Sequence, residues 1–376
     1  MAVTPSHLPP TQTVLVALSE GKYTIAPRHA LPKQPPAPRD ITVRVSHVAL
    51  NPCNWKMIDF SPAIGTVGGN DFSGEVVAIG AEVQRWRIGD AVCGFLYGLD
   101  PHAGEDGWAG AFAQYVSVDQ GLVMRVVPGL GRAEAACLGA GITTAGMALF
   151  RSLGLPPIAT SQATANGGGK PVKNRPYLLV YGGSTATGTM AIQLARHAGY
   201  TPIATCSPSN FDLVTSFGAE KVFDYHSPSC GVSMRAYTRG KLEHVVDCIT
   251  DSDSVRTCYA ALGPRGGKYT ALEPPPEHAK GARKDISSDW VMALTIFGKP
   301  VDLKGPFGCD AAPGDMEWAR SWYVQAEQLC EKGLLRPHPA RVANGTWAEV
   351  LEGIDELRSG KVRGTKLVYN IQQMQG

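Results

Sequence analysis

The stretch from Val180 to Ala195, VYGGSTATGTMAIQLA, constrains the fold more than any other part of the chain. It continues an apolar run, passes through two glycines and then takes on a helical pattern of apolar residues. A strand, a glycine turn and a helix form the start of a dinucleotide-binding βαβ unit, whose helix N-terminus holds a pyrophosphate. The fingerprint G-x-G-x-x-G is broken, because Thr185 stands where its middle glycine belongs. The turn alone therefore fits either nucleotide binding or a plain βαβ connection.

The segments that follow repeat the same alternation. Helices are expected in TMAIQLARHAG and NFDLVTSFGA, which end at Gly199 and Gly218, and strands in YLLVY, TPIATC, KVFDY, LEHVVDCI and GGKYTAL. Strands that alternate with helices imply a parallel, doubly wound sheet.

The first third of the chain has a different texture. Residues 11–125 read as all-β, with period-two alternation in ITVRVSHVAL (41–50), SGEVVAIG (73–80) and GDAVCGF (89–95). From residue 133 an Ala-rich stretch predicts two helices, with a break at Gly139 and Gly141. The closing strand GTKLVYNI is expected to return to the first domain. We thus predict an α/β chain with a β-rich domain in 1–145 and 340–376, and a doubly wound domain with the βαβ series in 146–339.

Composition excludes several classes of protein. The net charge of +2 gives no strong attraction to nucleic acid or to a membrane surface, and no apolar run approaches the roughly 18–20 residues of a membrane span. The N-terminal residues lack the features of a signal peptide. The nine cysteines never come closer than ten residues, which excludes C-x-x-C motifs and does not resemble a disulfide framework. We expect a cytoplasmic protein with free thiols.

The residues after the second strand of the βαβ series bear on the choice of cofactor. NAD-binding units hold the ribose 2′-hydroxyl with an acid near this point. Here the strand ends in ATCSPSN, with Ser207, Ser209 and Asn210 and no carboxylate, so a 2′-phosphate is tolerated and NADP is favoured over NAD. The turn lacks a basic residue, and simple helix capping by these side chains is the alternative. Around the glycine turn, the hydroxyls of Ser184, Thr185 and Thr187 are expected to add donors for the phosphates.

Further motifs resemble the medium-chain dehydrogenase/reductase superfamily over nearly the whole chain. They are GGNDFSGEVVAIG and RIGDAVCG, followed by GAFAQYV (110–116), the Ala-rich segment and GTKLV (364–368). The resemblance implies a GroES-like catalytic domain beside a Rossmann domain. Zinc alcohol dehydrogenases of this superfamily carry Gly-His-Glu where this chain has Gly69, Asn70 and Asp71. Without that histidine and without a cysteine cluster we expect no metal, and we interpret Cys53 as a packing or cofactor-side residue.

A narrower set of motifs resembles the trans-acting enoyl reductases of fungal polyketide synthases. In order, the motifs are NPCNWKM, AGITTAGMAL, LLVYGGSTAT, IATCSPSNFDL, KVFDY, DCIT, TIFG and GTKLV. The family consists of stand-alone partners of a synthase, often a polyketide–peptide hybrid, whose own enoyl reductase domain is inactive. The resemblance implies reduction of an α,β-unsaturated thioester with NADPH, on an acyl chain held by the carrier domain of the synthase.

The resemblance also implies which residues hold the cofactor and the substrate. The cofactor residues would be Cys53, Asn54, Trp55, Lys56, Ser184, Thr185, Ala186, Thr187, Ser207, Pro208, Ser209, Asn210, Tyr225, Leu272, Glu273, Val362 and Arg363. The acyl chain would lie along Thr144, Ala145, Gly146, Met147, Ala148, Leu149, Phe150 and Arg151, and along Ala293, Leu294, Thr295, Ile296 and Phe297.

Two of these residues are candidates for catalysis. Lys56 would orient the cofactor ribose and polarise the site, while Thr144 or a water would position the thioester. The alternatives are a surface lysine and a threonine inside a helix. No residue stands out as a dedicated acid, which leaves solvent as the source of the proton, and His102 and His244 read as structural or exposed.

Three further expectations concern partners and alternatives. Arg151, Lys170, Lys173 and Arg175 either dock an acidic carrier or form a solvated loop. A monomer is predicted, because Pro300, Pro306 and Pro313 follow TIFG and lack the N–H that edge pairing needs. The alternative functions are a quinone or alkenal reductase of the same superfamily and a catalytically silent, NADPH-binding scaffold.

Overall fold

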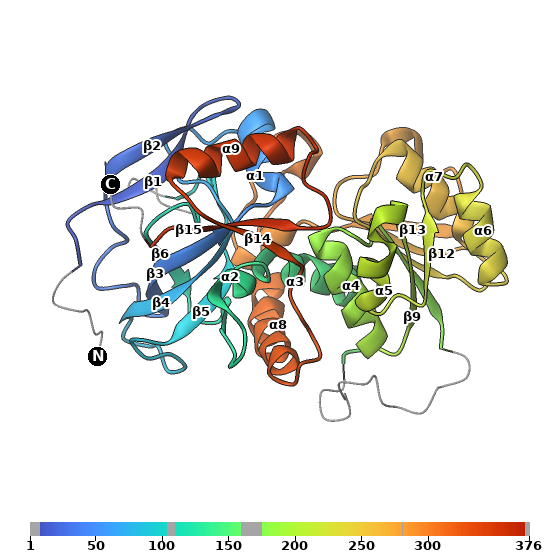
Figure 1. The fold of residues 1–376 in the computed structure, drawn as a ribbon, viewed down its shortest axis with the longest axis horizontal. Coiled ribbons are helices and arrows are strands. Elements are labelled where there is room, and N and C mark those ends of the chain that lie inside the picture. Colours follow the sequence, from blue (N-terminus) through green and yellow to red (C-terminus); the bar gives the residue numbers. More distant parts are fainter. Residues whose placement is uncertain (1–7, 104–109, 159–174, 280, 373–376) are drawn as a thin grey trace. The chain divides into compact units, whose positions relative to one another are not determined.

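The computed structural model describes residues 8–103, 110–158, 175–279 and 281–372, and the chain divides into two compact units (Figure 1). The first unit comprises 1–140, 294–327 and 337–376, and the second comprises 141–293 and 328–336. The expected boundaries, at 145/146 and 339/340, differ from this division chiefly in residues 294–327, which belong with the first unit. Ion pairs join this segment to the rest of the first unit, since Arg320 pairs with Asp119 and Lys299 with Asp100. Such long-range pairs leave no local pattern in a sequence.

The first unit is built around a seven-stranded sheet. Its order is β14 (Ala340–Asn344), β15 (Lys366–Asn370), β3 (Asp40–Ala49), β4 (Asp71–Ile79), β5 (Ala91–Phe95) and β7 (Val123–Arg125), and β6 (Tyr115–Asp119) also pairs with β3. The expected strands at 41–50, 73–80 and 89–95 are present, and the C-terminal strand β15 pairs antiparallel with β3, as expected. A hairpin of β1 (Gln12–Ser19) and β2 (Lys22–His29) completes the β structure.

Helices cover this sheet, and one of them corrects the expectation that residues 11–125 are all-β. Helix α1 (Pro52–Phe60) begins after Asn51, whose extended backbone precedes a proline at the first helical position. The other helices of the unit are α2 (Arg132–Ala135), η5 (Gly305–Phe307), most of η4 (Ala293–Phe297) and of α8 (Pro313–Glu331), and α9 (Trp347–Arg358). Helix α9 packs closely on the sheet, because a Cβ at Gly353 would lie 2.1 Å from the hydroxyl of Tyr369.

The second unit contains a six-stranded parallel sheet. Its order is β10 (Lys221–Asp224), β9 (Thr201–Cys206), β8 (Tyr177–Tyr181), β11 (His244–Asp247), β12 (Gly267–Ala271) and β13 (Ile286–Trp290). This is the doubly wound arrangement that the sequence predicts, and its order reverses between β8 and β11. The helical segments of the unit are η1 (Met147–Ser152), α4 (Ala186–His197), η2 (Pro208–Asn210), α5 (Phe211–Ser216), α6 (Cys230–Tyr237), α7 (Ser252–Ala261) and η3 (Glu277–Ala279).

One edge of the parallel sheet bears on the expected monomer. The edge strand is β13, which contains no proline, and Pro300, Pro306 and Pro313 lie outside it. The proline argument therefore does not apply to this edge.

The Ala-rich stretch forms α2, then α3 (Gly139–Gly146) and η1. The break falls at 136–138, just before Gly139, while Gly141 lies inside α3 and does not interrupt it. Gly139 is required by packing, because a Cβ there would lie 2.4 Å from the carbonyl oxygen of Gly94. Among the described residues, the segment Arg132–Ser152 is long and apolar enough to cross a membrane, but 78% of its apolar window is buried in the fold. We therefore interpret it as a core segment.

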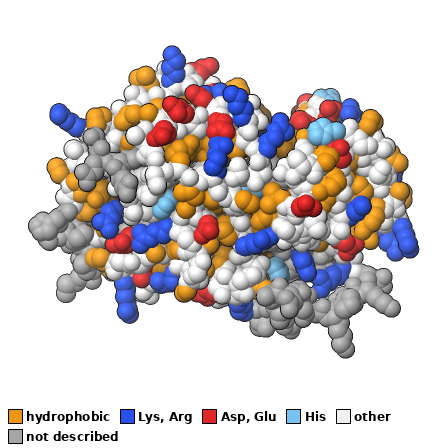
Figure 2. All heavy atoms as spheres, viewed as in Figure 1, with side chains coloured by type: hydrophobic (Ala, Val, Ile, Leu, Met, Phe, Trp, Pro, Cys, Tyr) orange, Lys and Arg blue, Asp and Glu red, His pale blue; other side chains and the backbone are white. Residues whose placement is uncertain are grey.

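The distribution of surface charge and the state of the cysteines match the expectations from composition. On the face shown in Figure 2, basic and acidic side chains are interspersed, without a single dominant field of one sign. All nine cysteines are free thiols, and Cys309 alone among them is exposed.

Candidate cofactor and reaction site

The turn after β8 has the geometry of a nucleotide-binding turn. Gly182 adopts a φ of +79°, and its N–H and that of Gly183 donate to the side chain and the carbonyl of Thr205. A Cβ at Gly183 would lie 2.8 Å from that of Ala204, and one at Gly188 would lie 2.3 Å from the carbonyl oxygen of Gly182. Side chains are thus excluded at all three glycines, as the sequence predicts for a turn that a phosphate approaches.

Thr185 has a different task from the one expected. Its hydroxyl donates to the carbonyl of Gly182 at 2.8 Å and accepts from the N–H of Gly188 at 2.9 Å. This makes Thr185 the N-cap of α4 and commits its hydroxyl proton inside the turn, so the expected hydroxyl donation to phosphate does not hold for Thr185. The backbone N–H groups of Ala186 and Thr187, in the first turn of the helix, are the groups oriented for an anion.

The ends of β9 and β10 lie together. Ser207 donates a hydrogen bond of 3.3 Å to the hydroxyl of Tyr225, whose ring stacks on His226 with centroids 4.1 Å apart. Residues 207–210 contain no carboxylate. The acid at the end of β10, Asp224, accepts from the backbone and the ring of His226, and these bonds lower its pKa. The structure thus brings the predicted ribose residue Ser207 and the predicted adenine residue Tyr225 into contact.

Asp247, at the end of β11, is a buried residue that the sequence analysis missed. It accepts hydrogen bonds from two backbone N–H groups, of Ile249 and Thr250, and from the hydroxyls of Ser254 and Tyr269. Burial raises the pKa of this carboxyl, and the hydrogen bonds oppose that effect. Its backbone carbonyl accepts from Leu272, which anchors the predicted pair Leu272 and Glu273 beside the end of β12. An acid closing the apolar run HVVD was the available signal.

The predicted cofactor segments of the second unit share one edge of the sheet. They are residues 184–187, residues 207–210, Tyr225, and the pair Leu272 and Glu273. Each follows the carboxyl end of a parallel strand, namely β8, β9, β10 and β12, and ligands of open α/β sheets bind at that edge where the strand order reverses. This edge is therefore the candidate nucleotide site of the second unit.

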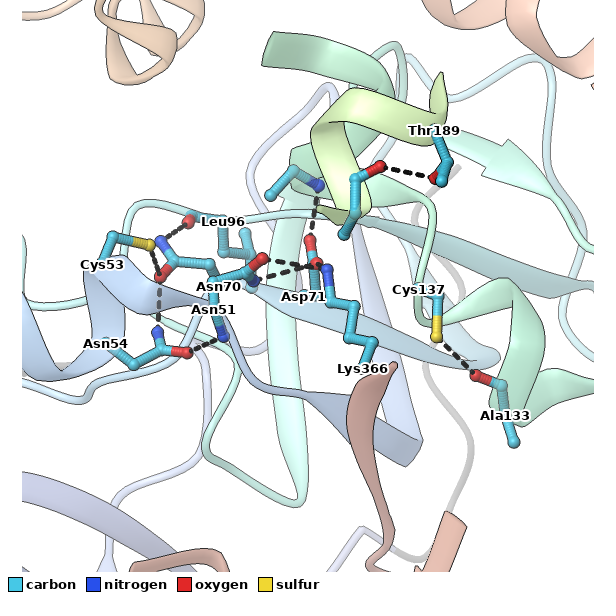
Figure 3. Close-up of polar contacts among 12 residues, drawn as sticks. Asn51, Cys53, Asn54, Asn70, Asp71, Leu96, Ala133, Cys137, Thr189 and Lys366 are labelled. Carbon is cyan, nitrogen blue, oxygen red and sulfur yellow. Dashed lines mark hydrogen bonds and ion pairs between the residues drawn. The ribbon is translucent and has the colours of Figure 1, made fainter. Parts of the chain in front are cut away.

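In the first unit, the predicted residues Cys53–Lys56 form the first turns of α1 (Figure 3). The Cys53 thiol donates to Oδ1 of Asn70 at 3.2 Å, and the Asn54 amide donates to the same oxygen at 2.6 Å. Burial raises the pKa of Cys53 to about 12, so its sulfur is a neutral thiol. Lys56 is half-buried, with its ammonium 5.7 Å from the ring centroid of Trp55.

The residues at the positions of the zinc-dehydrogenase motif do not fit a metal. The Asn70 amide is engaged by Cys53, Asn54 and the carbonyl of Leu96. Among the described residues, no group of three or more His, Cys, Asp or Glu side chains could hold a metal ion. The described residues around Asn70 therefore do not form the set of ligands that a tetrahedral zinc ion needs.

Asp71 instead forms an ion pair with the side chain of a lysine. Its Oδ2 accepts from the ammonium of Lys366 at 2.5 Å and from the side-chain amide of Asn51 at 3.0 Å. Lys366 also donates to Oδ1 of Asn51 at 2.9 Å. The second carboxylate oxygen accepts from the N–H of Ala140 at 2.6 Å, in the first turn of α3.

The remaining predicted residues are distributed over both units. In the second unit Thr144 is half-buried in α3, and Ala145 to Leu149 are buried. In the first unit Leu294, Thr295 and Ile296 are buried, Val362 is half-buried and Arg363 is exposed. Phe297 packs against Phe95 and Tyr97, and it lines a cavity of about 310 Å³ with Leu96, Tyr97 and Met316.

The structure also gives the contacts or exposure of both histidines and of two of the basic residues that the sequence singled out. His102 pairs with Asp302 at 2.8 Å, and His244 is half-buried against Tyr200, with its pKa lowered by burial. Arg151 is exposed and Arg175 half-buried, whereas Lys170 and Lys173 lie outside the described residues.

Comparison with known proteins agrees with this architecture. Residues 37–128 match the alcohol dehydrogenase GroES-like domain and residues 186–272 match the zinc-binding dehydrogenase domain. The fold is shared with an alcohol dehydrogenase superfamily protein from Novosphingobium aromaticivorans, at a TM-score of 0.76 and 21% identity over 96% of this chain and 100% of that one. The two units thus define a nicotinamide-dependent oxidoreductase of the medium-chain dehydrogenase/reductase superfamily.

Two relatives narrow the class. The chain is 41% identical to trans-enoyl reductase caaB of Aspergillus niger, over 97% of this chain and 98% of that protein. It is 40% identical to trans-enoyl reductase opdC of Penicillium oxalicum, over 97% and 98% respectively. The chain belongs to the trans-enoyl reductase family.

Proposed function

We propose that this protein reduces the carbon–carbon double bond of an α,β-unsaturated polyketide thioester, held on the carrier domain of a polyketide synthase or polyketide–peptide hybrid synthase, with hydride from NADPH. The observation that carries the proposal is the nucleotide edge of the second unit in a chain 41% identical to a trans-enoyl reductase. A glycine turn, a helix start and the Ser207–Tyr225 pair converge on that edge.

NADPH, when bound, supplies the hydride for the β-carbon of the substrate. The thioester oxygen then gains negative charge, and hydrogen-bond donors aimed at that oxygen accelerate the reaction. We propose that Lys56 orients the cofactor ribose and polarises the site, and that Thr144 or a water positions the thioester. The proton for the α-carbon comes from solvent. The acyl chain contacts residues 144–151 and 293–297, most of which are buried or half-buried.

The preference for NADPH rests on residues 207–210, where no carboxylate would repel a 2′-phosphate. Ser207→Asp places an acid at the end of β9 and is expected to shift the ratio of kcat/KM values from NADPH towards NADH by at least about tenfold. Ser287→Asp, on the exposed strand β13, adds the same charge away from the nucleotide edge and should leave the ratio unchanged.

The decisive assay follows NADPH oxidation with an α-methyl enoyl pantetheine thioester, beside NADH and beside a simple quinone. Thioester reduction with NADPH alone supports the proposal. Turnover of the quinone alone would replace it with a quinone reductase activity. NADPH binding without turnover of either compound calls for the carrier-loaded acyl chain, and inactivity on that substrate would identify a scaffold.

We further propose a cytoplasmic monomer, in keeping with nine free thiols and with the charged side chain of Asp289 on the edge strand β13. Light scattering that gives twice the mass of 39.9 kDa at micromolar concentration would overturn the monomer.

A further inference from the structure

A buried ion pair lies beneath the start of α1 (Figure 3). The side chains of Lys366 and Asp71 are 3% and 0% exposed, and their charged atoms are 2.5 Å apart. Removing two charges from water is costly, and well-packed apolar residues of similar volume often stabilise a protein equally well. Stability alone therefore does not account for the choice of a lysine and an aspartate here.

The ion pair holds the residue from which α1 starts. Asn51, the N-cap residue of α1, receives a hydrogen bond from Lys366 on its side-chain oxygen and donates to Asp71 from its side-chain nitrogen. Both ends of its amide are thus fixed by the pair. In this orientation the amide oxygen accepts from the ammonium and the amide nitrogen donates to the carboxylate, so one side chain binds both charged groups.

The restraint continues into the helix itself. The backbone N–H of Asn51 donates to Oδ1 of Asn54 at 2.7 Å, and the Asn54 amide donates to Asn70 at 2.6 Å. Cys53 donates to the same oxygen of Asn70. Helix α1 has no acid in its first turn, where these uncharged contacts hold the helix start instead.

We propose that Lys366 and Asp71 are positioning residues for the reductase: through Asn51, their ion pair fixes the first turn of α1 and with it Cys53–Lys56. The assignment rests on the proposed function in one respect, namely that these α1 residues act at the nicotinamide end of the cofactor. Lys366 and Asp71 touch neither cofactor nor substrate in this scheme and act through α1.

The test is the double variant K366M/D71N, which removes both charges and leaves neither buried without a partner. Loss of the restraint should lower kcat for the thioester by about 10- to 100-fold, because a misplacement of about 1 Å has effects of that size. The Kd for NADPH should change much less than kcat, since the residues proposed for the pyrophosphate and the 2′-phosphate belong to the second unit. Hydrogen exchange of the peptide covering residues 51–60 should become faster.

A matched control lies at the other end of the same helix. Arg358 forms a two-point ion pair with Asp59, at 2.8 and 3.0 Å, with side chains 30% and 22% exposed. R358M/D59N removes that pair from α1 without touching its first turn. It should keep the wild-type kcat and the wild-type exchange of residues 51–56.

Asn51→Ala provides a second route, because it cuts the link to α1 and keeps the ion pair. It should reproduce the loss of kcat, and it decides the question if the double variant does not fold. K366R, which keeps the charge, should recover activity relative to K366M. Wild-type kcat and exchange in a folded K366M/D71N, or in N51A, would overturn the proposal. If the wild-type protein reduces no thioester, the proposed function fails, but the exchange comparison still decides whether the ion pair positions α1.

Discussion

Asp71 in the first unit and Asp247 in the second are both completely buried, and the two carboxylates are satisfied in opposite ways. Asp71 in the first unit faces the ammonium of Lys366, whereas Asp247 in the second unit faces only uncharged donors. The partners of Asp247 lie within 22 residues of it, but Lys366 lies 295 residues from Asp71. A carboxylate buried by local structure can be held by nearby N–H and O–H groups, while one buried between distant segments here has a full counter-charge.

The largest effect should come from removing the counter-charge in the first unit. K366M leaves Asp71 buried without its cation, which is expected to cost about 3–5 kcal/mol of unfolding free energy. Denaturant titration measures this loss, and the double variant K366M/D71N should recover most of it. Equal stabilities of the single and double variants would show that Asp71 does not need a cation.

Asp247 should respond less, because no isolated charge is created there. D247N replaces an acceptor of four hydrogen bonds by an amide that must turn a donor towards one of them, at an expected cost of about 2 kcal/mol. The same titration tests it, with S254A as the milder comparison at about 1 kcal/mol. A loss as large as that of K366M would erase the distinction between the two sites.

Acid should act on the first unit through His338. Burial, and secondly the charge of Lys366, lower the pKa of His338 from 6.5 to about 4. As the pH falls, this histidine is therefore protonated in the unfolded chain before it is protonated in the folded protein. The contribution of the neutral His338 side chain to stability is complete above about pH 6.5. It should be lost at about 1.4 kcal/mol per pH unit as the pH falls from 6.5 to 4. H338Q should flatten this part of the stability profile, and an unchanged slope would contradict the assignment.

The smallest effect concerns two helix starts. Thr185 caps its own helix α4, whereas the side chain of Asn51 is bound by the ion pair beneath α1. T185A should cost about 1 kcal/mol, and T185S, which keeps the hydroxyl, should cost less. A thermal melt monitored by circular dichroism is sufficient. If T185S is as unstable as T185A, the hydroxyl is not the capping group.

The sequence predicted those features that depend on local pattern. Strands β3 and β8, the helices that end just before Gly199 and Gly218, and the glycine turn after β8 all follow from apolar periodicity and turn chemistry. The parallel sheet followed from their alternation.

The features it did not predict depend on partners distant in sequence or on polar residues inside a strand pattern. Helix α1 interrupts a region read as all-β, and strand β13 (ISSDW) is too polar to show a strand pattern. The segment 294–327 belongs to the first unit, to which it is joined by long-range ion pairs such as Arg320–Asp119. Thr185 carries a hydroxyl suited to a phosphate, and only the turn geometry shows that this group serves the backbone.

The pairing of β15 with β3 has a consequence for synthesis on the ribosome. The first unit is assembled from three separate stretches of chain, and its central strand gains a neighbour, and Asp71 its cation, only when residues 366–370 have been made. The second unit needs little beyond residue 293 and can fold earlier in translation. Until β15 has been made, the β-rich unit keeps an open sheet edge and an unpaired acid, so this nascent chain should depend on chaperones most before that strand emerges.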